Sequence, residues 1–306
     1  MRDGFLPSFL NYTGGKYSVL SQIIPLFPLK YERFIDLFCG SGTVAINVAN
    51  VCSDKGSEYV LNDANEYVIE ILKTLNEIQA DKFLAIADEL IDEYHLSNTE
   101  KFGYSYYRAD SSRGLADINR NKYYKLRNDY NRHVFTGYQK SVALYVLVVF
   151  SFNNQIRFNS KMEFNLPVGK RDLNQSMRKK LTDMGKVIGN HNFSFSTNDF
   201  ELFQFFPNDF VYCDPPYLIT TATYNENGLW SVQHEKRLLK MLDSLNDIGI
   251  RFALSNVIYH KGEKNYILIN WSKKYRTHFI KKNYNNSNYQ SSAKQDKTQE
   301  VLITNY

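Results

Sequence analysis

Short apolar runs that pass into helix-like spacing organise the N-terminal part of the chain. One run, Arg33–Phe38, leads through a turn with two glycines, Cys39–Gly42, into helical spacing at Thr43–Ala49. A second run, Glu58–Asn62, passes into helical spacing between Val68 and Leu75. Short apolar runs bounded by turn residues are typical of buried strands. Two strand-to-helix units in succession predict parallel strands joined by right-handed crossovers.

The strand-like pattern returns after residue 190. Helical spacing over Gln233–Leu245 separates two of these later runs. The polar stretch Asn283–Gln295 is expected to be a mobile loop. The simplest assembly is one α/β domain made from both ends of the chain, with an insertion between its second and third strands. The later strands are expected at Phe193–Ser196, Asp209–Cys213, Ile250–Ser255 and Glu300–Asn305.

The insertion differs from its flanks in charge. It contains an acidic amphipathic stretch, Lys82–Tyr94, and an apolar run, Val142–Phe150, which predicts a buried helix. Between Lys101 and Asn190 there are 17 Lys and Arg against 6 Asp and Glu, so this segment carries +11 and leaves −6 elsewhere in a chain of total charge +5. A basic segment inside an acidic chain is the pattern expected of nucleic-acid binding. On charge alone, a solvated basic face without a partner is an equal alternative.

Composition excludes several classes of protein. The 306 residues suffice for about two domains, and 43% apolar with 23% charged residues are globular values. The uncharged stretch Ser141–Asn154 is too short for a bilayer and residues 1–11 lack a secretory signal, so we expect a cytoplasmic protein without a membrane segment. Cys39, Cys52 and Cys213 lack CxxC spacing, which argues against a disulfide framework and a zinc site, and no metal is expected.

The glycine turn after the first strand is a candidate cofactor site. Gly40 and Gly42 let the backbone turn sharply after Asp36, and Asp63 at the end of the next strand is placed to accept hydrogen bonds from ribose hydroxyls. A structural turn with a helix-capping Asp fits the string nearly as well. A nicotinamide dehydrogenase would use the same residues but would leave the basic insertion unexplained. The chain has no Gly-x-x-x-x-Gly-Lys-Ser/Thr string, so a phosphate-binding P-loop is not supported.

Two further strings carry candidate chemistry. Asp214-Pro215-Pro216-Tyr217 follows an apolar run, where two prolines fix an acidic side chain and a carbonyl as acceptors at a strand end. Such acceptors suit an NH2 group, and the tyrosine offers a flat face to a planar ring. A rigid turn with a surface Asp is the alternative. Near the N-terminus, Asn11–Lys16 combines paired glycines with a lysine, which taken alone fits a flexible loop.

In this order and spacing the strings resemble a known family, the Dam-type (D12 class) DNA adenine-N6 methyltransferases, particularly the T-even phage Dam enzymes and the GATC restriction-system methylases. The resemblance implies an α/β, Rossmann-like sheet dependent on S-adenosylmethionine, with an inserted, mainly helical target-recognition domain bearing a β-hairpin. Residues 1–76 and 186–306 would form the discontinuous catalytic domain and residues 77–185 the insertion. The matching strings are Tyr12–Lys16, Phe34–Gly42, Leu61–Asp63, Tyr124–Asn131, Asn154–Asn159, Phe164–Arg171, Phe210–Tyr217 and Ser255–Asn256.

The resemblance implies S-adenosylmethionine as the cofactor and assigns residues to its pocket. Phe200 would stack on the cofactor's adenine. Asp214 and the Pro215 carbonyl would accept hydrogen bonds from N6 of a target adenine flipped out of duplex DNA, next to Pro216, and Tyr217 would stack on the base. The implied cofactor residues are Tyr12, Gly14, Lys16, Asp36, Phe38, Gly40, Ser41, Gly42, Thr43, Asp63, Asp199, Phe200 and Asp214.

Double-stranded DNA is the implied partner, bound by a monomer or weak dimer, with a cognate restriction endonuclease acting separately. Arg157 matches a family position that contacts a guanine edge, whereas Lys170 and Arg171 would bind phosphates. GATC is the leading recognition site. Gln155 stands where the family usually has an apolar Leu or Met, and its amide can hydrogen-bond adenine, so a different recognition site is an alternative. Methylation of RNA or of cytosine N4, and a catalytically silent DNA-binding protein, are the alternatives. The implied base-contacting residues are Phe152, Asn153, Gln155, Arg157, Asn159 and Pro167.

Overall fold

The chain forms two compact units, each assembled from separate stretches of sequence. In a computed structural model, the described residues are 4–12, 14–51, 56–110, 112–220, 230–281 and 298–306. Unit 1 comprises residues 1–5, 16–64 and 191–306, and unit 2 comprises residues 6–15 and 65–190. The expected loop at Asn283–Gln295 lies outside the described residues. No helix in the described part of the chain is long and apolar enough to cross a membrane.

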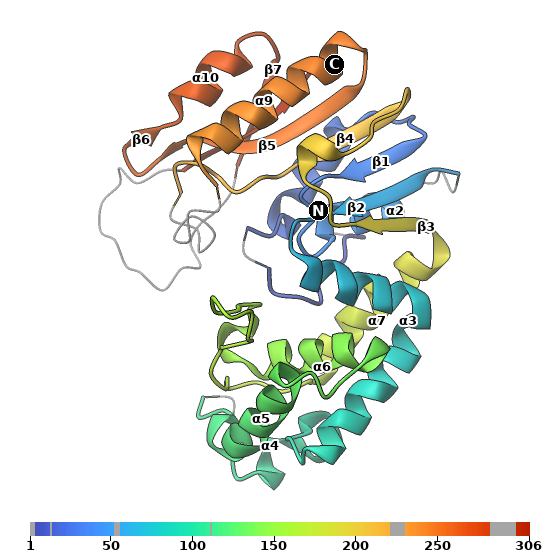
Figure 1. Cartoon of the computed structure of the whole chain (residues 1–306), viewed down its shortest axis with the longest axis vertical. Helices are drawn as coiled ribbons and strands as arrows, with labels where there is room; N and C mark the ends of the chain where they lie inside the picture. Colours follow the sequence, from blue (N-terminus) through green and yellow to red (C-terminus); the bar gives the residue numbers. More distant parts are fainter. Residues whose placement is uncertain (1–3, 13, 52–55, 111, 221–229, 282–297) are drawn as a thin grey trace. The chain divides into compact units, whose positions relative to one another are not determined.

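Unit 1 is built around a mostly parallel sheet (Figure 1). The strand order is β3-β2-β1-β4-β5-β8-β7, with the short β6 paired to β5. The first five strands of this order are parallel, whereas β8 runs antiparallel to both β5 and β7. The strands are β1 (Arg33–Asp36), β2 (Glu58–Asn62), β3 (Asn192–Ser196), β4 (Asp209–Cys213), β5 (Arg251–His260), β6 (Glu263–Lys264), β7 (Arg276–Ile280) and β8 (Gln299–Thr304).

Apolar side chains cover both faces of this sheet. On one face, strand side chains such as Ile35, Val211 and Phe252 pack with leucines of α9 and α10. On the opposite face, Phe27 makes ring contacts with Phe34, at 5.9 Å between ring centroids. Burial on both faces explains the nearly continuous apolar runs of the central strands. The helical segments of this unit are η1 (Tyr17–Val19), α1 (Leu20–Ile23), η2 (Ile24–Leu26), α2 (Thr43–Val51), η4 (Phe200–Leu202), α9 (Val232–Asp247) and α10 (Tyr266–Ser272).

The α/β sheet expected from the sequence is confirmed. All six predicted strands are present, and the segment between β2 and β3 carries unit 2. The strands β6 and β7 were not predicted. In β7 the side chains of Arg276–Ile280 are half-buried or exposed, so the segment lacks the apolar run that marks the central strands.

Unit 2 is helical. The central helix, α6, is buried from Ser141 to Phe150 and packs against α3 and α5, which confirms the predicted buried helix. Helix α3 also packs against α7 and contains a kink at Gln79, where φ is 62°. Phe9 joins the segment 6–15 to this unit through a ring contact of 5.8 Å with Tyr145. The helices are α3 (Glu66–Glu93), α4 (Thr99–Tyr106), α5 (Ala116–Asn131), α6 (Gly137–Phe150), η3 (Phe152–Asn154) and α7 (Gln175–Asn190).

The domain boundaries expected at residues 77 and 185 fall inside α3 and α7. Both helices belong whole to unit 2, because each packs on the other over its length. The compact unit therefore extends beyond the expected insertion at both ends. The assignment of this insertion to DNA recognition stays a prediction.

The expected β-hairpin takes the form of an irregular antiparallel loop after α6, residues 151–169, which we call the excursion. Within the described residues its two arms meet at isolated bridges, Ser151 with Val168 and Phe158 with Phe164, without a regular ladder. Asn153 and Asn154 have φ of 58° and 53°, which breaks the extended conformation of the first arm. The excursion is nevertheless pinned at its base, where Phe152 N donates to the Pro167 carbonyl at 2.8 Å.

Candidate active site

The carboxyl ends of β1 and β4 lie next to each other in the middle of the sheet. The two strands are parallel neighbours, with Asp36 opposite Tyr212. From β1 the sheet continues to β2 on one side and to β4 on the other. Open α/β sheets bind ligands at such a switch point, outside the carboxyl ends of the strands. Asp36, the last residue of β1, and Asp214, directly after β4, therefore stand where a ligand is expected.

Two glycines shape the turn between β1 and α2. Gly40 and Gly42 have positive φ, 50° and 70°. A Cβ on Gly42 would lie 2.8 Å from Leu61 Cδ2, so both conformation and space exclude a larger residue. Asp63 accepts a hydrogen bond from Gly40 N at 2.8 Å. The turn thus links the ends of β1 and β2, as the sequence expectation for a cofactor site requires.

Asp36 is a buried acid with one oxygen left unpartnered. Its Oδ2 accepts from Ala45 N at 3.4 Å, whereas Oδ1 has no hydrogen-bond partner among the described residues. Burial, followed by the negative charge of Asp214, raises the pKa of Asp36 well above 3.8. The neighbouring Ser41 and Thr43 hydroxyls share a hydrogen bond of 2.9 Å. A buried oxygen without a donor fits a ligand that carries an ammonium or hydroxyl group.

Phe38 and Phe200, two expected cofactor residues from different strand ends, contact each other. Their ring centroids are 5.5 Å apart, and Trp230 lies 5.7 Å from Phe38. Asp199 caps η4, and its carboxylate lies 3.6 Å from the Arg237 guanidinium. That guanidinium in turn lies 5.4 Å from the Phe200 ring. The structure therefore brings Phe38 and Phe200 together in one aromatic cluster, next to the ion pair of Asp199 and Arg237.

Four polar side chains meet next to β4. The Lys16 ammonium lies 2.6 Å from Asp214 Oδ2 and 3.4 Å from Glu300 Oε1. It also donates to the Tyr217 hydroxyl at 2.5 Å. That hydroxyl lies within donating distance of Asp214 Oδ1, at 2.8 Å, and of Glu300 Oε1, at 3.2 Å. Three predicted residues and one unpredicted glutamate thus form a single cluster.

Burial governs the protonation of this cluster. It raises the pKa of Asp214, although the positive charge of Lys16 opposes the shift. Burial alone would lower the pKa of Lys16, but attraction to Asp214 and Glu300 outweighs it, and that pKa is raised. Burial and the two carboxylates raise the pKa of Tyr217 well above 10.0. Lys16 is therefore charged and Tyr217 is a neutral hydroxyl over the physiological range.

Other predicted residues of the site fall in different surroundings. Pro215 is buried and Pro216 is half-buried, and both follow Asp214 in unit 1. Tyr12 and Gly14 belong to the segment 6–15 of unit 2. Their contact with a cofactor stays a prediction.

The predicted DNA-contacting residues lie along the excursion after α6. Phe152, Asn153 and Pro167 are exposed, and 54% of Phe152 is accessible to solvent. Gly169 closes the base of the excursion, donating to the Phe150 carbonyl at 2.7 Å.

Two of these residues have partners within the excursion. The exposed Arg157 donates to Asn165 Oδ1 at 2.8 Å, which orients its guanidinium. Asn159 accepts from the backbone N–H groups of Lys161 and Glu163 at 2.9 and 3.0 Å, so it builds the turn at the tip. Gln155 is half-buried. Whether these side chains contact bases stays a prediction.

Helix α5 clamps the returning arm of the excursion. Asn131 donates to and accepts from the backbone of Phe164, at 3.1 and 2.9 Å. Tyr123 and Arg127 both donate to the Leu166 carbonyl, at 3.0 and 3.1 Å. These hydrogen bonds from side chains of one helix to backbone groups of the arm fix the course of the arm. This helix is the source of the Tyr124–Asn131 string that was noted in the sequence.

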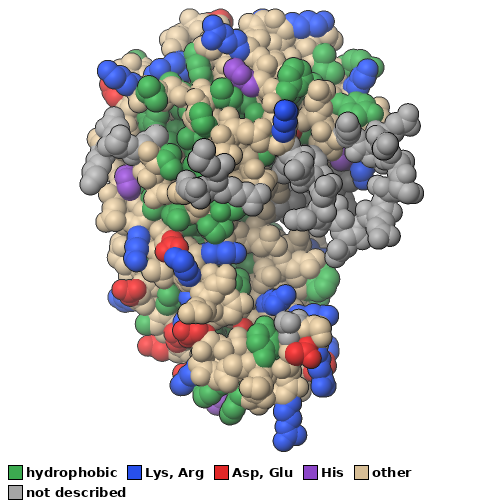
Figure 2. Space-filling view, turned by 180° about the vertical axis from the view of Figure 1, so that it is seen from behind, with side chains coloured by type: hydrophobic (Ala, Val, Ile, Leu, Met, Phe, Trp, Pro, Cys, Tyr) green, Lys and Arg blue, Asp and Glu red, His purple; other side chains and the backbone are tan. Residues whose placement is uncertain are grey.

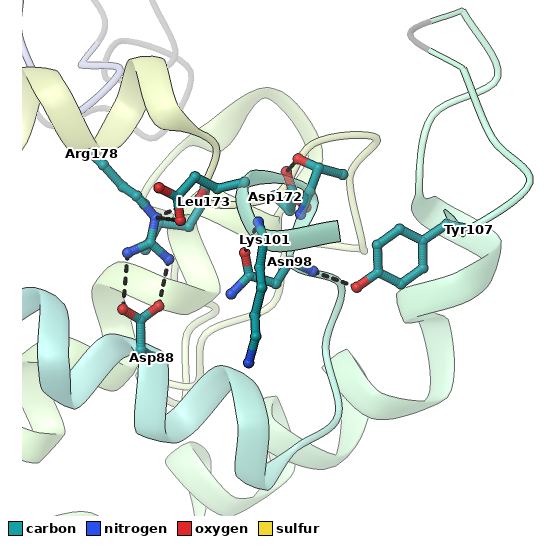
Figure 3. A network of polar contacts seen from close by, with 9 residues as sticks. Asp88, Asn98, Lys101, Tyr107, Asp172, Leu173 and Arg178 are labelled. Carbon is teal, nitrogen blue, oxygen red and sulfur yellow. Dashed lines mark hydrogen bonds and ion pairs between the residues drawn. The ribbon is translucent and has the colours of Figure 1, made fainter. Parts of the chain in front are cut away.

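A buried acid anchors the segment that carries Lys170 and Arg171. Asp172 accepts from Thr99 N and Thr99 Oγ1, both at 2.7 Å. Nearby, Arg178 pairs with Asp88 and donates to the Leu173 carbonyl at 3.1 Å (Figure 3). Lys170 and Arg171 are themselves exposed. On the face drawn in Figure 2, the described Lys and Arg side chains stand apart, with acidic side chains among those of the lower part.

Sequence reasoning missed Glu300 as a member of the site. The sequence places it at the start of an apolar strand, and it is 2% exposed. A glutamate next to Val301 in such a strand is a signal, because a buried acid needs a partner. Among the described residues, no group of three or more His, Cys, Asp or Glu is arranged to hold a metal ion.

A mostly parallel sheet with two carboxylates, Asp36 and Asp214, at the strand ends of its switch point is typical of a Rossmann-like α/β protein. The chain belongs to the D12 class of N6 adenine-specific DNA methyltransferases, whose family profile matches residues 12–298. It is 38% identical, over 99% of its length, to the type II methyltransferase M.FokI of Planomicrobium okeanokoites and to the modification methylase StsI of Streptococcus sanguinis. It spans 43% of the length of each of these two relatives.

A more distant relative is similar along most of its own length. The DNA adenine methylase of Salmonella typhi is 24% identical over 81% of this chain and 80% of that protein. The D12 family expected from the sequence is thus confirmed. A particular closeness to the T-even phage enzymes stays a prediction.

Proposed function

We propose that the protein transfers the methyl group of S-adenosylmethionine to N6 of an adenine in double-stranded DNA. The observation that carries the proposal is the position of Asp214. This carboxylate directly follows β4 at the switch point, in contact with Lys16 and Tyr217. Membership of the D12 class supports adenine N6 as the acceptor.

The N6 lone pair of adenine is delocalised into the ring and is a poor nucleophile. Asp214 and the Pro215 carbonyl would accept hydrogen bonds from the two N–H groups of the amine. Two acceptors on these bonds favour a tetrahedral nitrogen and stabilise the positive charge that develops during attack. Tyr217 has its hydroxyl held by Asp214 and Lys16, so its ring is fixed in orientation for stacking on the base.

Bound S-adenosylmethionine supplies the electrophilic methyl group on a sulfonium. Several residues of this chain fit its parts. The unpartnered oxygen of Asp36 suits the ammonium of the methionine moiety, and Asp63 suits ribose hydroxyls. Phe38 and Phe200 offer aromatic faces to the adenine. Holding the cofactor and amine in one pocket brings the reacting atoms into line.

Access to a base in a duplex requires flipping, which costs a few kcal/mol of unstacking. Recognition is assigned to the excursion, with Arg157 reading a guanine edge and Lys170 and Arg171 binding phosphates. GATC is the leading recognition site. M.FokI is named a type II methyltransferase and StsI a modification methylase, and a restriction endonuclease acting separately is part of the proposal. The enzyme would act on cytoplasmic DNA as a monomer or weak dimer.

The test measures transfer of labelled methyl from S-adenosylmethionine to duplex DNA, with single-molecule sequencing of plasmid from expressing cells to map modified bases. We expect modified adenines within one recognition motif. Label on cytosine or on RNA alone would establish the exocyclic-amine alternative. Specific DNA binding without any transfer would establish a catalytically silent binding protein.

A further inference from the structure

Glu300 is a buried carboxylate for which the proposed reaction has no role. It belongs to β8 and is 2% exposed, between the solvent-facing Gln299 and the buried Val301. Its Oε1 lies 3.4 Å from the Lys16 ammonium and 3.2 Å from the Tyr217 hydroxyl. A buried acid keeps its charge when partners compensate it. Lys16 and Tyr217, which also hold Asp214, are two such partners.

Both oxygens of Asp214 are engaged by neighbouring side chains. Oδ2 pairs with the Lys16 ammonium at 2.6 Å, and Oδ1 accepts from the Tyr217 hydroxyl at 2.8 Å. A carboxylate neutralised by an ammonium at this distance is a weak stabiliser of a second cation. The amine becomes positive during methyl transfer, so Lys16 opposes the proposed role of Asp214 as long as it stays there.

Lys16 is itself buried, with 3% of its side chain exposed. An ammonium removed from water cannot leave one carboxylate without a second one to receive it. Glu300 is that second carboxylate, less than one ångström farther from the ammonium than Asp214 is. Within the part of the chain that the structure describes, the cluster therefore pairs one ammonium with two carboxylates.

We propose that Glu300 is a positioning residue that receives the Lys16 ammonium when the target amine binds Asp214. The proposal rests on the proposed function, since it assigns the amine to Asp214. Before the amine binds, Lys16 compensates both carboxylates. When the amine binds, Lys16 moves to Glu300, and Asp214 faces the amine with its full negative charge. No covalent bond changes in this step.

The principal variant is Glu300→Gln, which keeps the size of the side chain and removes its charge. We expect kcat for methyl transfer to fall at least about tenfold, because Lys16 then stays on Asp214. Glu300→Asp restores the charge and should recover part of the rate. Glu263→Gln, on the exposed strand β6, is the matched control and should leave kcat unchanged. Affinity for S-adenosylmethionine should change less than about twofold in Glu300→Gln, since the cofactor does not require Glu300.

A second background separates positioning from packing. In Lys16→Met there is no ammonium to receive, so adding Glu300→Gln should not reduce kcat further. An equal fold-loss from Glu300→Gln in both backgrounds would overturn the proposal, because a packing defect is independent of Lys16.

Titration of Asp214 supplies a readout that needs no activity. Among the described residues, the charged and titratable groups that act on this carboxyl are Lys16, Asp36, Tyr212, Cys213, Tyr217 and Glu300. Glu300 raises the pKa of Asp214, so Glu300→Gln should lower it, as followed by NMR of 13C-labelled aspartate against an Asp214→Asn reference. An unchanged pKa would overturn the link between the two acids. Absence of methyl transfer by the wild type would instead refute the proposed function, whatever the titration shows.

Discussion

The Lys16 ammonium and the Asp214 carboxylate form an ion pair of 2.6 Å, although they come from opposite parts of the sequence. Asp214 is the acceptor that the proposed reaction needs, and Lys16 holds it. The pairing favours the ionised form of this half-buried acid, because the ammonium opposes the effect of burial on the pKa of Asp214.

Asp214→Asn tests the catalytic assignment. The amide keeps the shape of the side chain but cannot carry the negative charge that stabilises the methylated amine. We expect methyl transfer to fall by about 100- to 1000-fold or more. Binding of S-adenosylmethionine, measured by calorimetry, should remain detectable. Asp117→Asn, an exposed acid of α5, is the control, and wild-type activity in Asp214→Asn would refute the assignment.

The pH dependence of kcat follows from the same group. Asp214 accepts hydrogen bonds as a carboxylate, so activity should rise as this group loses its proton. Burial raises its pKa above 3.8, and the acidic limb of the profile should therefore lie above that value. The measurement is kcat at saturating cofactor and DNA between pH 4 and 9. A rate that does not change over the acidic range would contradict the role of Asp214.

Asp36→Asn is expected to stabilise the ligand-free protein while weakening cofactor binding. The folded protein holds Asp36 with a raised pKa, so it retains a proton that the unfolded chain loses above 3.8. Wild-type stability therefore falls as pH rises from 3.8 to the folded pKa, and Asp36→Asn removes that loss. The free energy of unfolding of Asp36→Asn should exceed that of the wild type by about 1–3 kcal/mol at alkaline pH, because this is the cost of one buried polar group without a hydrogen bond.

Urea unfolding at pH 4 and pH 9 measures this difference for the wild type and Asp36→Asn. We expect the two proteins to have similar unfolding free energies at pH 4 and to separate at pH 9. A variant that is destabilised at both values would show that Asp36 is structural and that its burial carries no cost.

Gly169→Ala tests whether the excursion after α6 depends on close backbone approach. A Cβ at this position would lie 2.2 Å from the Ser151 carbonyl oxygen, so the base of the excursion must shift. We expect a loss of about 1–3 kcal/mol of stability and weaker DNA binding. Thermal unfolding and a DNA-binding titration check the two effects. Ser160→Ala, at the exposed tip, should leave stability within about 0.5 kcal/mol of wild type.

The DNA-contacting residues divide into two kinds with different signatures. Arg157→Ala should cost about 1–3 kcal/mol on the cognate site and little on other sequences, because a bidentate contact to guanine is lost. Lys170→Ala should weaken binding to all sequences alike and reduce the slope of log K against log salt by about 1. Fluorescence anisotropy with cognate and unrelated duplexes, over a range of salt, distinguishes them. Equal losses of binding free energy on both duplexes for Arg157→Ala would show that Arg157 does not contribute to sequence recognition.

The sequence by itself determined six of the eight described strands and the family. Central strands such as Asp209–Cys213 are apolar because both faces of the sheet are covered, and this leaves a pattern that a linear reading detects. The same holds for the glycine turn, since the positive φ at Gly42 favours that residue type. Edge strands such as Arg276–Ile280 were not predicted, because half-exposed positions do not require apolar side chains.

The tertiary structure alone decided which side chains share the site. Lys16 and Glu300 meet at Asp214 because the order of strands brings β8 and the start of the chain to the carboxyl end of β4, and no local pattern encodes that order. It also gave Asn159 partners within its own turn. Local periodicity reports whether a residue is buried, whereas the partner of a buried charge is set by contacts between distant segments.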